Sequence, residues 1–182
     1  PAAVAQARIR SGRSQRVFVG RERELGELHA LLDDAVAGRG SIALIAGEPG
    51  IGKTRLLDQF VSEAERRGSR AHWGRCWEVG GAPAFWPWIQ ALRDLLAERG
   101  VPRVQSWLGD GRADLAQLLP ELGASREGDL DDQSARFPLF DAISRLLASA
   151  AQDAPLVVVL ADLHAALRSS LGLVYLLPRG AH

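Results

Sequence analysis

The chain has little of several residue types on which common protein classes depend. It holds one cysteine, Cys76, so neither a disulfide framework nor a cysteine-based metal site can form within it. Its 22 basic and 22 acidic residues balance, which excludes a global electrostatic pull toward nucleic acid or an anionic membrane. We therefore expect a protein of a reducing compartment, the cytoplasm, with no membrane partner.

Long apolar runs are also missing. The run at 156–160 is far too short to cross a bilayer, and the Arg-rich first residues lack the apolar centre of a secretory signal. Because the balanced charge gives no overall attraction to nucleic acid, we expect contact with DNA only through a domain outside this sequence.

Methionine is absent altogether, and lysine occurs once. With no methionine even at position 1, we expect a fragment of a longer reading frame. Lys53 is the only lysine, and every other basic residue is an arginine. One position that breaks so strong a preference suggests a place where a planar guanidinium cannot replace a compact ammonium group.

Hydrophobic periodicity predicts an α/β protein. Apolar stripes predict helices over 22–36, 53–68, 87–99, 134–151 and 165–177, with shorter helical pieces around 104–108 and 113–119. Short apolar runs predict strands over 41–46, 70–76 and 155–161. The third run is unbroken, which suits a parallel strand covered on both faces. This alternation predicts a three-layer α/β/α fold with a parallel sheet and a helical insert between the second and third strands.

The most informative motif is a glycine-rich loop at 47–54. Its sequence, GEPGIGKT, matches G-x-x-x-x-G-K-[ST] at every fixed position, between a predicted strand and a predicted helix. Glycines let backbone amides approach phosphate oxygens as an anion nest, and the helix adds its positive end. Lys53 is expected to reach the β- and γ-phosphates, and Thr54 to offer its hydroxyl to Mg²⁺. The alternative is a glycine turn without a ligand, but the position of the only lysine favours the phosphate site.

An acidic residue, Asp162, follows the third predicted strand. P-loop enzymes hold the Mg²⁺ shell with an acid at the end of a nearby apolar strand. Many relatives carry two acids in succession there, whereas this chain has Ala161 and then Asp162. In the usual register the metal carboxylate is missing, so we expect nucleotide binding with slow or absent hydrolysis. Capping of the last predicted helix is the alternative role for Asp162.

An ordered series of segments resembles a known family. The segments are VFVGREREL at 17–25, GEPGIGKTRLL at 47–57, GRC at 74–76, PAFWPW at 83–88 and DLH at 162–164. They resemble the ATPase module of STAND-type signalling ATPases, also described as origin-recognition-like AAA ATPase domains. Such modules occur in large LuxR-type transcription regulators and beside nucleotide cyclase domains. The resemblance starts at residue 17, which leaves 1–16 as a linker and 17–182 as the N-terminal part of the domain.

The resemblance carries its own expectations about the ligand and the fold. It implies ATP or ADP with Mg²⁺, switching coupled to other domains of a longer chain, and an option of nucleotide-dependent self-association. In this fold class the sheet order is usually 5-1-4-3-2, so the C-terminal strands are expected to be missing here. Family members commonly read Asp-Leu-His-Trp-Ala-Asp after the third strand. This chain lacks the Trp and the final Asp, which again favours weak hydrolysis.

Three functions stay open: a nucleotide switch in a LuxR-type regulator or a cyclase-containing protein, an enzyme (ATPase or small-molecule kinase), and a truncated copy without function. The insert shows no obvious lid motif, which disfavours a kinase. Catalytic candidates are Lys53 and Asp162, and metal candidates are Thr54 and Asp162. The resemblance adds Val19, Gly20 and Arg21, near the adenine side, to the expected nucleotide-binding residues, which are otherwise Gly47, Glu48, Pro49, Gly50, Ile51, Gly52, Lys53, Thr54 and Arg55.

Overall fold

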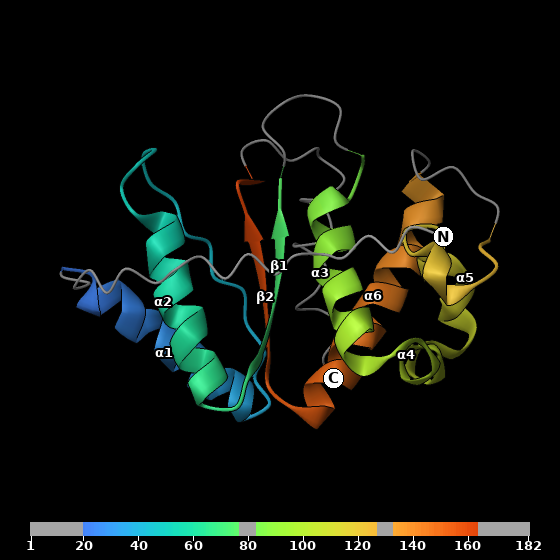
Figure 1. Ribbon diagram of the computed structural model, residues 1–182, viewed down its shortest axis with the longest axis horizontal. Helices are drawn as coiled ribbons and strands as arrows, with labels where there is room; N and C mark the ends of the chain where they lie inside the picture. The colour runs from blue at the N-terminus through green and yellow to red at the C-terminus, as the bar shows by residue number, and fades with distance from the viewer. Residues whose placement is uncertain (1–19, 77–82, 127–132, 164–182) are drawn as a thin grey trace, which may run out of the picture.

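A small parallel sheet lies at the centre of a mixed α/β fold (Figure 1). The computed structural model describes residues 20–76, 83–126 and 133–163. Strands β1 (Arg70–Arg75) and β2 (Leu156–Ala161) pair in parallel, with Arg70 opposite Leu156 and Arg75 opposite Ala161. The α/β class and the parallel pairing of these two predicted strands are confirmed.

The helices follow the predicted stripes closely. Two lie before β1, and the others form the insert between β1 and β2, together with the 3₁₀ turns η1 (Gly109–Gly111) and η2 (Pro120–Leu122). The predicted helix at 165–177 lies outside the described residues. No helix in the described ranges is both long and apolar enough to cross a membrane. The helices are α1 (Glu22–Val36), α2 (Lys53–Arg66), α3 (Trp86–Arg99), α4 (Val101–Leu108), α5 (Arg112–Leu115) and α6 (Gln133–Asp153).

Both faces of the sheet are covered, which explains the unbroken hydrophobicity of β2. Ala71, Val157 and Val159 pack against the apolar stripes of α1 and α2. The alternate residues Leu156 and Val158 pack against a larger core built from α3 to α6. Because strand side chains alternate between faces, each core takes every second residue of β2.

The predicted first strand at 41–46 is wrong. This segment is irregular backbone that runs from α1 toward loop 47–54, and Leu44 is 81% exposed. Only Ile45 packs against the core of α1 and α2. A strand exists through hydrogen bonds to a neighbouring strand, and none of the described residues offers 41–46 such a partner. Segment 41–46 therefore has the composition of a strand but no hydrogen-bonded partner strand.

Helix α3 approaches β1 so closely that only glycine fits at position 74. A Cβ atom there would overlap the backbone carbonyl of Pro87, in the first turn of α3. One residue along, the side-chain amide of Gln90 accepts from the backbone N–H of Arg75 at 3.2 Å and donates to its carbonyl at 3.0 Å. The Gln90 side chain thereby pairs with the backbone N–H and carbonyl of Arg75 in β1. These contacts with the main chain of β1 attach the insert to the sheet.

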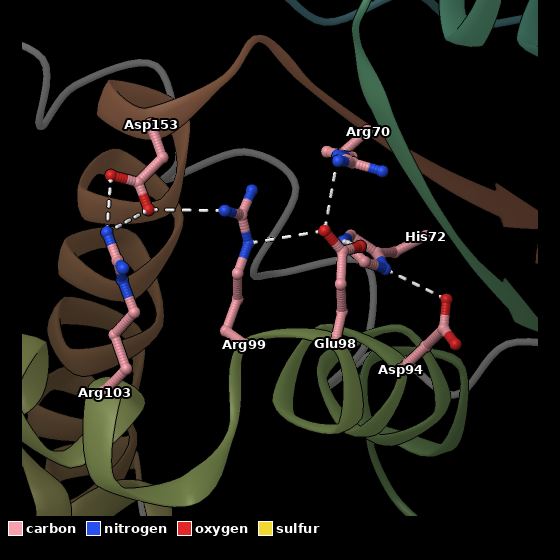
Figure 2. Close-up of polar contacts among 7 residues, drawn as sticks. All are labelled: Arg70, His72, Asp94, Glu98, Arg99, Arg103 and Asp153. Carbon is pink, nitrogen blue, oxygen red and sulfur yellow. Dashed lines mark hydrogen bonds and ion pairs between the residues drawn. The ribbon is translucent and has the colours of Figure 1, made fainter.

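A chain of polar contacts continues this attachment toward α6 (Figure 2). His72, only 2% exposed, has Nδ1 2.9 Å from a carboxylate oxygen of Asp94, whereas Nε2 lies 3.7 Å from Glu98, beyond hydrogen-bond reach. At the other end, Asp153 accepts from two arginines of α3 and α4. Because an unpaired buried polar group costs about 1–3 kcal/mol, the contact of the buried His72 Nδ1 with Asp94 favours one placement of α3 on β1. The chain comprises Arg70, His72, Asp94, Glu98, Arg99, Arg103 and Asp153.

Gly74→Ala is expected to destabilise the domain strongly. The new methyl group must displace the Pro87 carbonyl, and overpacking of this kind costs about 1–3 kcal/mol or more. Thermal melting followed by circular dichroism measures the loss.

Gly26→Ala is the matched control, because Gly26 lies on the exposed side of α1 with nothing within 4 Å of an added Cβ. It should raise stability by up to about 1 kcal/mol through helix propensity. Equal melting temperatures for the two variants would contradict the close approach of α3 and β1.

Candidate functional site

Loop 47–54 owes its path to two glycines in the left-handed region. Gly50 has φ of 79° and Gly52 has φ of 97°, values that L-residues with side chains adopt only under strain. Between them, the backbone N–H of Ile51 reaches the Glu48 carbonyl at 3.4 Å, which closes a turn. Gly52 is the residue that precedes α2, so the loop leads directly into the first turn of that helix.

Lys53 folds back over its own loop. Its ammonium group donates to the carbonyl of Gly47 at 2.7 Å and to that of Glu48 at 3.0 Å. An ammonium group has three N–H donors, so these two contacts leave one for another acceptor. The single lysine of the chain thus places its charge inside the curve of the loop.

The loop is open to solvent at a helix N-terminus. Residues 47–52 are exposed, as are Thr54 and Arg55, and Lys53 is half-buried. The first amides of α2 have no intrahelical partner, and the helix dipole adds positive potential there. In Figure 1 the loop lies at the same end of the molecule as the carboxyl ends of β1 and β2. An anion could therefore meet backbone donors and the ammonium group together.

Arg21, thirty residues away in sequence, contacts the loop directly. Its Nη2 donates to the Ile51 carbonyl at 2.9 Å, and its Nη1 pairs with Glu24 at 3.0 Å. Gly20 lies beside it, whereas Val19 lies outside the described residues. The family motif drew attention to Arg21, but nothing in the sequence indicated that Arg21 binds a carbonyl of the glycine-rich loop.

The start of α1 is held by the side chain of Glu22. Its Oε1 accepts the backbone N–H of Gly20 at 3.1 Å. Hydrogen bonds from the backbone amides of Glu22 and Gly20 lower the pKa of this carboxyl from its ordinary 4.5. The ionised carboxylate therefore stabilises the fold above pH 4.5, and this stabilisation is lost as the pH falls through the lowered pKa of Glu22. These contacts fix the backbone on both sides of Arg21.

Asp162 stands at the end of β2 in an unusual conformation. Its φ is 60°, and its side chain is exposed, whereas Ala161 before it is buried. Within the part of the chain that the structure describes, Asp162 makes no hydrogen bond or ion pair with Lys53 or Thr54. The described residues also hold no cluster of three or more metal-binding side chains. A Mg²⁺ ion held by one hydroxyl and substrate phosphates does not need such a cluster.

Cys76, one residue past β1, reports on the position of Asp162. Burial raises the pKa of the Cys76 thiol, and the negative charge of Asp162 raises it further. The thiol is buried and free of any disulfide. The backbone N–H of Cys76 donates to the Ala161 carbonyl at 3.1 Å, so the ends of β1 and β2 lie side by side and the charge of Asp162 disfavours the Cys76 thiolate.

Asp162→Asn is expected to make Cys76 more reactive toward iodoacetamide. Removing the neighbouring charge lowers the thiol pKa and increases the reactive thiolate fraction between pH 7 and pH 9. The alkylation rate, followed by mass spectrometry, should rise. Asp110→Asn, a change in the exposed turn η1, is the control and should leave the rate unchanged. A rate that is the same in all three proteins would contradict the placement of Asp162.

Comparisons with known proteins identify the family of the chain. The profile of the family described as "AAA ATPase domain" matches residues 17–181. A protein of Rhizobium meliloti (strain 1021), printed as "Uncharacterized protein R02095", is 27% identical over 166 residues, which cover 84% of this chain and 16% of that protein. The chain thus spans only a small part of that relative's length. No solved structure matches the chain. Because the family match extends over nearly the whole sequence, including loop 47–54 and both strands, the chain belongs to the AAA ATPase domain family.

Proposed function

We propose that this domain is an ATP-binding switch module of a larger signalling protein, with weak or absent hydrolysis. ATP or ADP binds with Mg²⁺ at loop 47–54, and the bound nucleotide biases the arrangement of attached domains. The single cysteine, which can form no disulfide within the chain, supports a cytoplasmic setting.

The geometry of the loop carries this proposal. Left-handed glycines, a helix N-terminus and an inward-folded ammonium group converge on one open site. Each of these features favours a polyphosphate over an uncharged ligand, because each supplies positive potential or N–H donors. Lys53 is proposed to bind the β- and γ-phosphates, and Thr54 to bind Mg²⁺. Membership of the AAA ATPase domain family supports an adenine nucleotide as the ligand.

The end of β2 supports slow hydrolysis. The residue that directly ends the strand is Ala161, which has no side-chain oxygen to offer a metal, and whose carbonyl already accepts from the backbone N–H of Cys76 at 3.1 Å. The next residue, Asp162, is exposed and turned away from the strand path by its left-handed backbone. A hydrolytic ATPase remains the second candidate function, favoured because Asp162 directly follows β2, whose carboxyl end lies at the same end of the molecule as the loop (Figure 1).

The host protein is proposed to be a LuxR-type transcription regulator, with a cyclase-containing protein as the alternative. Support for either host comes from the sequence resemblance alone, whereas the relative, of which this chain covers 16%, supports only a host protein longer than this chain. DNA contact and nucleotide-dependent self-association would then belong to the assembled protein, in which other domains read the state of this one.

ATP binding is tested by calorimetry and melting in Mg²⁺ buffer. ATP at a hundredfold excess over its Kd should stabilise the domain by about 2.7 kcal/mol, a shift of several degrees for a chain of this size. Lys53→Ala should weaken binding about ten- to a hundredfold, because it removes hydrogen bonds from a charged donor. Lys53→Arg should also bind poorly.

Arg66→Ala is the matched control, because it removes a cation from the other end of α2. It should bind ATP as the original chain does. A folded protein that shows no heat and no melting shift with ATP would overturn the proposal, and equal binding by all variants would remove Lys53 from the site.

Slow turnover is a separate prediction. Phosphate release from ATP should stay close to the buffer background, and Asp162→Asn should change ATP affinity by less than about twofold, because Asp162 contacts neither Lys53 nor Thr54 in the described structure. Release at the 1–10³ s⁻¹ that is typical of enzymes, abolished by Asp162→Asn, would instead establish the ATPase.

A further inference from the structure

Arg21 is held at the start of α1 by one backbone contact and one side-chain contact besides its contact with the loop. Arg21 precedes α1, and its own carbonyl accepts the N–H of Leu25 at 3.0 Å, in the first turn of the helix. Glu24, on that same turn, holds Nη1, so Nη2 is directed at the Ile51 carbonyl. The Arg21 side chain is 29% exposed, and its contact with Glu24 is partly buried, whereas its contact with the Ile51 carbonyl is open to solvent.

The contact of Arg21 with the Ile51 carbonyl also restrains the N–H of Gly52, which belongs to the same peptide group. The described chain contains no cis peptide bonds, so the Ile51 carbonyl and the Gly52 N–H point in opposite directions from one planar unit. Gly52 has φ of 97° and could turn its peptide group easily, because glycine has no side chain to restrain it. A charged donor on the Ile51 carbonyl stops that rotation and fixes the direction of the Gly52 N–H.

We propose that Arg21 is a positioning residue: held by Glu24, it binds the Ile51 carbonyl and so aims the Gly52 amide at a bound polyphosphate. The inference rests on the proposed function, because it gives the Gly52 amide a phosphate to bind. It differs from a direct contact of Arg21 with adenine, because it acts through the hydrogen bond from Nη2 to the Ile51 carbonyl of the loop. Arg21 also links α1 to the loop, so the start of α1 is sensitive to what the loop binds.

The test separates the phosphate part of the ligand from the nucleoside part. Calorimetry with the whole chain measures binding of Mg-ATP, of inorganic pyrophosphate and of adenosine. Arg21→Ala should weaken ATP and pyrophosphate by a similar factor, about tenfold, as expected for one charge-assisted hydrogen bond, and should leave adenosine unchanged. Arg21→Lys, which keeps one donor, should recover part of the loss. Arg23→Ala is the control, since among the described residues Arg23 pairs only with Glu27, on the exposed side of α1.

A second measurement reports on the amide itself without any ligand. In a ¹⁵N–¹H spectrum of glycine-labelled protein, Arg21→Ala should move the Gly52 resonance, and Arg23→Ala should not. A merely structural role for Arg21 would lower the melting temperature and leave this resonance and the pyrophosphate affinity in place.

Several outcomes would overturn the inference. These are loss of adenosine affinity with pyrophosphate unchanged, no loss for any ligand, or a Gly52 resonance that ignores the substitution. If the original chain binds neither ATP nor pyrophosphate, the proposed function is wrong, and so is the proposal that Arg21 orients an amide toward a bound phosphate. In that case the Gly52 resonance still decides whether Arg21 orients the amide, so the two failures are distinguishable.

Discussion

The candidate site depends first on the left-handed backbone at Gly50 and Gly52. Without those two conformations the chain could not turn within three residues from the Glu48 carbonyl into the first turn of α2. The turn positions the backbone of Lys53 at the start of α2. From there its ammonium group reaches back to the carbonyls of Gly47 and Glu48. A local steric allowance, available to glycine alone, thereby gathers charge and N–H donors in one place. The long-range contact from Arg21 adds to an arrangement that those glycines make possible.

The parts of the molecule that could be predicted from the sequence are the local ones. Helices such as α1 and α2 follow from apolar stripes within a few turns, and loop 47–54 follows from a motif of eight adjacent residues. Segment 41–46 was predicted wrongly because a strand needs hydrogen bonds to another part of the chain, which its composition cannot supply. The contacts of Arg21 with Ile51 and of His72 with Asp94 span 30 and 22 residues. Only the folded chain shows such partners.

The two faces of the sheet pack against two different hydrophobic cores. On one side, α1 and α2 share a small core that supports the loop and includes Val159 of β2. On the other side, the insert forms the larger core, in which Phe85 keeps a left-handed backbone while its ring packs edge-on against Phe140 at 6.0 Å. Between them, β1 and β2 contact both cores. The carboxyl ends of these two strands lie at the same end of the molecule as the loop (Figure 1).

A single ε-amine in the whole chain has a chemical consequence. Acylation of lysine removes its positive charge and its ability to donate three hydrogen bonds. In most proteins such a reaction spreads over many surface lysines, but here every encounter of an acyl donor with an ε-amine occurs at Lys53, half-buried beside the carbonyls of its own loop. Acyl donors and amine-reactive labels would find one lysine ε-amine in this domain, and its acylation would have the same result as deleting the charge of Lys53.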